Sequence, residues 1–127
     1  MKVRRVFHQN VTCIEGWELV RDAARKMHEG GFSCLPVISG DDLVGIITER
    51  DVVEAMAQND DPSIASVFDY MTEAPHTIGP EDDCTVAATE MLAIGCRHLP
   101  VVEEGRLIGV VSARDLLPLA TSGAVYP

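Results

Sequence analysis

Residues 45–51 read Gly-Ile-Ile-Thr-Glu-Arg-Asp, and residues 109–115 read Gly-Val-Val-Ser-Ala-Arg-Asp, a shift of 64 positions (109 − 45). With this shift and no gap, residues 11–54 and 75–118 match at twelve positions. A long period that is present only twice does not indicate a solenoid, which needs three or more repeats to bury its faces. The sequence therefore predicts two similar halves that complete one core together, with paired sites in a cleft between them.

Each half carries the same order of secondary-structure signals. A short β-favouring piece comes first, at Val11–Ile14 or His76–Ile78, and an amphipathic helix follows. Two apolar runs joined by a Gly-bearing polar turn then predict a β-hairpin in each half. A second helix starts after each hairpin. The sequence therefore predicts an α/β fold of mixed α+β type, built from tandem β-α-β-β-α repeats.

The helix signals and the repeat give the expected boundaries. Gly31 and Gly95 are expected to end the first helix of each half. Pro80 and the acids after it predict the start of the helix in the second half, because proline and acidic residues suit a first helical turn. We expect these segments: a first repeat at 6–59, a connecting segment at 60–74 with a short helix at Ser63–Met71, a second repeat at 75–120 and a tail at 121–127.

Charge and cysteine content narrow the classes of function. The 127 residues carry a net charge of −10, which argues against general binding to nucleic acid or to an anionic membrane. A small phosphate ligand stays compatible, since backbone amides and arginines can act locally against the overall field. The four cysteines form no C-x-x-C pair, and we found no signal peptide or long apolar run. We expect reduced, metal-free thiols and a cytoplasmic protein.

The duplicated motif has two interpretations that the sequence leaves open. In the first, a hydroxyl residue, an arginine and an aspartate at a helix start bind a nucleotide. The free backbone amides, the hydroxyl group and the arginine bind the phosphate, and the carboxylate accepts hydrogen bonds from the ribose hydroxyls. In the second, Thr48 with Asp51, and Ser112 with Asp115, form capping boxes that only stabilise the helices. The two roles can coexist.

The repeats resemble the CBS domain, the regulatory repeat named after cystathionine β-synthase. The resemblance is carried by Leu-Pro-Val at 35–37 with residues 43–51, by Arg-His-Leu-Pro-Val-Val at 97–102 with residues 107–115, and by the lead-in Asp-Tyr-Met-Thr at 69–72. It covers about Val6 to Leu119. It implies a CBS pair, or Bateman module, in which two mixed sheets pack about a pseudo-two-fold axis with the helices outside.

The resemblance also implies up to two clefts for adenosine-containing ligands such as AMP, ADP, ATP, NAD or S-adenosylmethionine. It implies ribose contacts from Asp51 and Asp115. It implies phosphate contacts from Thr48, Arg50, Ser112 and Arg114, and from Arg97 and His98 before the second Leu-Pro. It places adenine against backbone near Thr12–Cys13 or Thr77–Ile78, and against side chains such as Phe32 and Cys96.

The first half lacks the two polar residues that precede Leu-Pro in the second half. Ser33 and Cys34 stand where the second half has Arg97 and His98, and residues 6–9 lack the family lead-in. We therefore expect unequal occupancy of the two sites, with Asp115, in the more cationic half, the firmer ribose contact.

No arrangement of Ser, His, Cys or acidic residues predicts an enzyme or a metal site. We predict a regulatory module that binds an adenosyl ligand and signals through conformation, oligomerisation or an unidentified effector protein. We expect a homodimer, because wide apolar helix faces on a small body favour two-fold pairing. The alternative is a ligand-free scaffold for protein interaction or oligomerisation.

Overall fold

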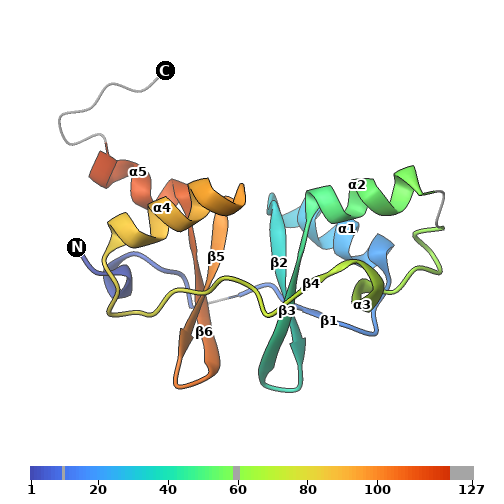
Figure 1. Cartoon of the computed structure of the whole chain (residues 1–127), viewed down its shortest axis with the longest axis horizontal. Coiled ribbons are helices and arrows are strands. Elements are labelled where there is room, and N and C mark those ends of the chain that lie inside the picture. Colours follow the sequence, from blue (N-terminus) through green and yellow to red (C-terminus); the bar gives the residue numbers. More distant parts are fainter. Residues whose placement is uncertain (10, 59–60, 121–127) are drawn as a thin grey trace. The chain divides into compact units, whose positions relative to one another are not determined.

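The computed structural model describes residues 1–9, 11–58 and 61–120, which form two compact units (Figure 1). We call residues 12–75 with residues 105–107 the Asp51 unit. We call residues 1–11, 76–104 and those from 108 onward the Asp115 unit. The expected tail at 121–127 and the boundary residues 59–60 lie outside the described residues.

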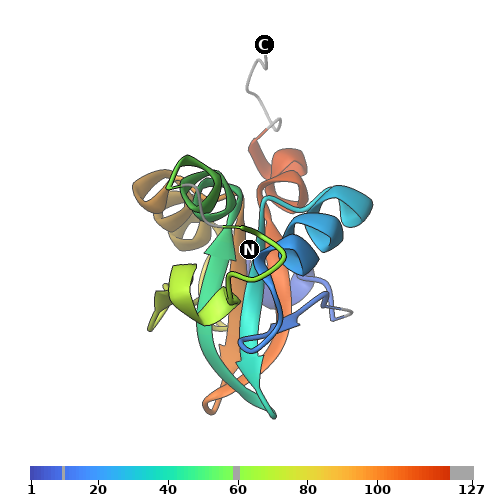
Figure 2. The ribbon, with the colours of Figure 1, turned by 90° about the vertical axis from the view of Figure 1, so that its right-hand side faces the viewer.

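The Asp51 unit confirms the predicted β-α-β-β-α order. Its elements are β1 (Ile14–Glu15), α1 (Val20–Gly30), β2 (Cys34–Ser39), β3 (Asp42–Thr48), α2 (Glu49–Ala57), α3 (Val67–Tyr70) and β4 (Thr72–Glu73). Strand β1 pairs in parallel with β2, and β3 pairs antiparallel with both β2 and β4. Figure 2 shows this unit from the side, with β2 and β3 as a twisted hairpin.

The Asp115 unit repeats this arrangement with one shorter piece. Its elements are the 3-10 helix η1 (Val3–Arg5), α4 (Cys84–Ile94), β5 (His98–Glu103), β6 (Arg106–Ser112) from residue 108 onward, and α5 (Ala113–Ala120). The predicted first strand is reduced to one parallel bridge between Ile78 and Val101. This bridge lies 64 positions after the pair of Ile14 and Val37 in the Asp51 unit.

Each unit has an aliphatic core with matching members. Leu35 and Leu99 are both 0% exposed, and the buried methionines Met27 and Met91 come from α1 and α4. Burying a leucine side chain fully contributes about 1.5–3 kcal/mol. The predicted helix ends are confirmed, since Gly31 (φ 71°) and Gly95 (φ 69°) adopt the left-handed conformation that favours glycine.

The prediction that Pro80 starts a helix is wrong. Helix α4 begins at Cys84, and Asp83 Oδ1 accepts from the Thr85 amide at 2.9 Å as its cap. The Pro80 carbonyl, which a helix would use, accepts instead from the Arg4 amide at 2.8 Å. The N-terminal segment therefore takes the backbone groups that would have extended the helix.

The predicted helix over Ser63–Met71 is also shorter than expected. Helix α3 spans only Val67–Tyr70, and the Ile64 side chain is 74% exposed. The Ala65 carbonyl accepts from the Val20 amide at 2.8 Å, at the start of α1. This contact removes the acceptor that a longer helix would need.

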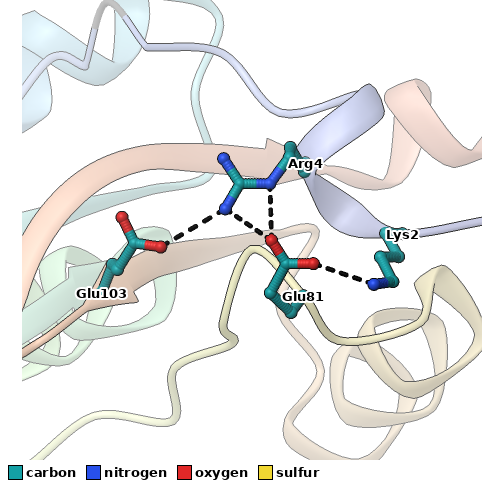
Figure 3. A network of polar contacts seen from close by, with 4 residues as sticks. All are labelled: Lys2, Arg4, Glu81 and Glu103. Carbon is teal, nitrogen blue, oxygen red and sulfur yellow. Dashed lines mark hydrogen bonds and ion pairs between the residues drawn. The ribbon is translucent and has the colours of Figure 1, made fainter.

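The N-terminal segment packs in the Asp115 unit as α3 and β4 pack in the Asp51 unit. Val3 and Val67, 64 positions apart, are both 0% exposed. Figure 3 shows the polar network that holds the segment to the loop before α4. Arg4 Nε donates to Glu81 Oε1 at 2.6 Å, and Lys2 Nζ donates to Glu81 Oε2 at 2.9 Å. Residues 1–9 thus pack in the same compact unit as α4 and the second hairpin.

Candidate functional site

The first candidate site lies where β3 ends and α2 begins. Thr48 is the N-cap of α2, and its Oγ1 accepts from the Asp51 amide at 3.2 Å. Asp51 Oδ2 in turn accepts from the Thr48 amide at 2.8 Å and from Thr48 Oγ1 at 3.0 Å. The capping interpretation is therefore confirmed for this half.

The second candidate site has the same capping box where β6 ends and α5 begins. Asp115 Oδ2 accepts from the Ser112 amide at 2.8 Å and from Ser112 Oγ at 2.9 Å. The Asp115 amide donates to Ser112 Oγ at 3.2 Å. The cap holds each aspartate through one carboxylate oxygen, so the ligand interpretation depends on the other oxygen.

That other oxygen distinguishes the two sites. Asp115 Oδ1 lies 2.7 Å from His8 Nε2, and the two side chains are 13% and 68% exposed. In the described part of the chain, no group is hydrogen-bonded to Asp51 Oδ1. The Asp51 carboxylate therefore keeps an acceptor that the Asp115 carboxylate shares with a histidine.

Few amides at these helix starts are free, contrary to the nucleotide interpretation. The Glu49 amide donates to the Ser33 carbonyl at 2.9 Å, and the Asp51 amide is bonded to Thr48. In the other half, the Ala113 amide donates to the Arg97 carbonyl at 2.7 Å. A ligand would therefore meet side chains more than backbone donors.

The residues predicted to bind phosphate include Arg50 and Arg114, each of which precedes a capping aspartate in the sequence. Arg50 and Arg114 are exposed, and neither side chain is hydrogen-bonded or ion-paired with another described residue. Arg97 is exposed, and its carbonyl accepts from the Ala113 amide at the start of α5. His98 is half-buried. The guanidinium groups of Arg50 and Arg114 are thus available to a phosphate.

The predicted adenine contacts are differently placed in the two units. Thr12 and Cys13 are half-buried, and the Cys13 carbonyl accepts from Lys26 Nζ at 2.9 Å. Burial raises the pKa of the Cys13 thiol, which keeps it protonated at neutral pH. Thr77 is exposed, whereas Ile78 is buried and its backbone groups bond to Pro100 and Val102.

The two side chains predicted beside adenine are mostly covered. Phe32 is half-buried and packs against the core of the Asp51 unit. Cys96 is 7% exposed, and its Sγ donates to the His98 carbonyl at 3.1 Å. Their role against adenine stays a prediction.

Sequence reasoning missed His8, which the structure brings to Asp115. Antiparallel bonds between His8 and Val110 hold its backbone, at 2.9 and 3.0 Å. An added Cβ on Gly109 would meet the His8 carbonyl and the Phe7 ring, so the glycine permits this close approach. Extending the 64-residue shift to the N-terminus aligns His8 with Thr72, which indicates the strand position of His8 but not its contact with Asp115.

Residues 1–9, 11–58 and 61–120 contain no group of three His, Cys, Asp or Glu side chains that could hold a metal ion. No helix among them is long and apolar enough to cross a membrane.

Comparison with known proteins places both repeats in one family. The CBS domain model matches residues 3–58 and 67–120. The chain is 42% identical over 109 residues to inosine-5'-monophosphate dehydrogenase of Korarchaeum cryptofilum, covering 85% of this chain and 22% of the dehydrogenase.

Two solved structures share the fold over nearly the whole chain. A putative signal-transduction protein with CBS domains from Burkholderia ambifaria is 27% identical with a TM-score of 0.85, over 98% of this chain and 95% of that one. The CBS domain pair of protein MJ0100, in complex with 5-methylthioadenosine and S-adenosyl-L-methionine, is 23% identical with a TM-score of 0.85, over 98% of both chains. The chain belongs to the CBS domain family and contains two CBS domains.

Proposed function

We propose that the protein is a regulatory module that binds an adenosine-containing ligand through the carboxylates of its two capping boxes. One observation carries this: Asp51 Oδ2 is fixed by Thr48, while its Oδ1 has no hydrogen bond within the described residues. A carboxylate held by its cap suits a ribose hydroxyl at its other oxygen. Arg50, which precedes Asp51 in the sequence and is unpaired among the described residues, suits a phosphate. The ligands of protein MJ0100 both carry adenosine, which supports this class.

A ligand panel tests the proposal. AMP, ADP, ATP, NAD and S-adenosylmethionine are added separately to the whole chain, and thermal unfolding is measured. A ligand at a hundred times its dissociation constant stabilises the fold by about 2.7 kcal/mol, or about 10 °C for a chain of this size. The matched control is the 2′,3′-dideoxy form of the ligand that binds, which should give a smaller shift. No shift with any member would favour the scaffold function.

The same proposal assigns a homodimer as the assembly through which ligand binding is transmitted. Helix α2 exposes Val53 (64%) and Met56 (58%), and α5 exposes Leu117 (43%). A second copy that covers these apolar side chains would remove them from water. We place this assembly in the cytoplasm, where the four cysteines stay reduced. Its role is regulatory rather than catalytic.

A further inference from the structure

We propose that His8 acts as a latch on Asp115, so that the Asp51 site binds ligand first and the Asp115 site binds only when His8 leaves. The contact of His8 Nε2 with Asp115 Oδ1 at 2.7 Å occupies the carboxylate oxygen that takes no part in the capping box. A ligand hydroxyl at Asp115 must therefore compete with the histidine. The ligand part of this inference rests on the proposed function.

The latch can open without unfolding the segment that carries it. The His8 backbone is held by its two bonds to Val110, whereas its side chain is 68% exposed. A rotation about the side-chain bonds therefore releases Asp115 and places the imidazole in water. The strand pairing does not change.

The Asp51 unit has the same backbone without the latch. Thr72 pairs with Ile46 as His8 pairs with Val110, and each pair is 64 positions from the other. No hydrogen bond joins Thr72 to Asp51 in the described part of the unit. The difference between the sites thus comes down to one side chain on an equivalent strand position.

The exposure of His8 limits how strong the latch is. Exposed ion pairs and hydrogen bonds contribute little, so the pair should weaken ligand binding at Asp115 by up to about fivefold. This is a bias in the order of filling rather than a block. It reverses the order that the cationic residues of the second half predict.

A ligand-free measurement tests the contact itself. Long-range ¹H–¹⁵N spectra of the whole chain report the Nε2 resonance of His8. We expect this resonance to move in Asp115→Asn and to stay in place in Asp51→Asn. A His8 resonance whose chemical shift is the same in Asp115→Asn as in the wild-type chain would overturn the latch, whatever the protein binds.

Calorimetry with AMP then tests the consequence. His8→Thr should strengthen the Asp115 site about two- to fivefold, and Thr72→His should weaken the Asp51 site by a similar factor. His28→Thr, an exposed histidine on α1, is the control and should change neither. Weaker AMP binding in His8→Thr would show that His8 contacts the ligand and would overturn the latch.

The two arms separate this inference from the proposed function. If AMP binds to no variant but the His8 resonance responds to Asp115→Asn, the contact holds and the adenosine proposal fails for AMP. If AMP binds and His8→Thr matches the wild-type chain at both sites, the adenosine proposal holds and the latch is wrong.

Discussion

Replacing Asp51 separates its role as a helix cap from its role as a ligand contact. Asp51→Ala removes the oxygen that accepts from the Thr48 amide at 2.8 Å and from Thr48 Oγ1 at 3.0 Å. Loss of a capping interaction lowers the free energy of unfolding by about 1 kcal/mol, which lowers the melting temperature by about 4 °C. Urea unfolding followed by circular dichroism measures this for the ligand-free chain.

The ligand affinity of the same variants carries the functional part of the prediction. Asp51→Asn keeps an oxygen for the Thr48 amide but loses the charge. Hydrogen bonds to charged groups contribute about 1 kcal/mol more than neutral ones, so we expect roughly fivefold weaker binding with near-normal stability. Asp51→Ala should weaken binding further, by up to about a hundredfold. Calorimetry with the ligand from the panel gives both values.

Helix α1 offers a matched control for this pair. The Leu19 amide donates to Asp22 Oδ2 at 3.0 Å, an equivalent contact at the first turn of α1. Asp22→Ala should therefore lower the stability about as much as Asp51→Ala and leave the affinity unchanged. If Asp51→Ala also leaves the affinity unchanged, the ribose assignment is wrong and the capping box explains the motif alone.

Three further predictions concern assembly, thiols and acid. Met56→Glu should convert the expected homodimer into a 13.8 kDa monomer in light scattering, and a wild-type chain already at that mass would contradict the dimer. Because burial raises the pKa of Cys13, its thiol should react slowly with iodoacetamide at neutral pH, and rapid labelling of the folded chain would contradict this. Hydrogen bonds from Lys2 and Arg4 lower the pKa of Glu81, so its contribution to stability is present above the ordinary glutamate pKa and is lost as pH falls through the lowered value. Glu81→Gln should therefore lower the melting temperature at about pH 7 and not at about pH 2, and an equal loss at both would contradict the charge effect.

The elements that the sequence predicts correctly are those that local signals determine. The hairpins follow from two apolar runs around a Gly-bearing turn, and the ends of α1 and α4 follow from Gly31 and Gly95. In each case the residues that cause the structure lie within a few positions of it. Duplication strengthens such signals, because two copies of the same pattern must serve the same fold.

The wrong predictions share a different cause. The Pro80 carbonyl bonds to Arg4, and the Ala65 carbonyl bonds to Val20, so segments far along the chain take the acceptors that a helix would need. Proline and acidic residues near 80 and the apolar spacing near 64 favour helix locally. Tertiary hydrogen bonds override these preferences, and a local pattern does not report them.

The two capping pairs of the candidate site follow from the motif, whereas the contact of His8 with Asp115 does not. Thr48 with Asp51 and Ser112 with Asp115 are the pairs that the motif indicates. The cationic residues of the second half predict Asp115 as the firmer contact. His8 lies 107 positions from Asp115 in the sequence, and the repeat, carried back to the N-terminus, indicates its strand position alone.

The capping box contributes to the proposed binding site because it fixes the carboxylate before a ligand arrives. Immobilising a flexible side chain on binding costs about 0.5–1.5 kcal/mol. Thr48 already restricts Asp51 through Oδ2, so a ligand hydroxyl at Oδ1 finds an acceptor that has little freedom left to lose. Asp115 is restricted in the same way by Ser112, but its second oxygen is held by His8. The same cap therefore prepares one carboxylate for a ligand and the other for the histidine that competes with it.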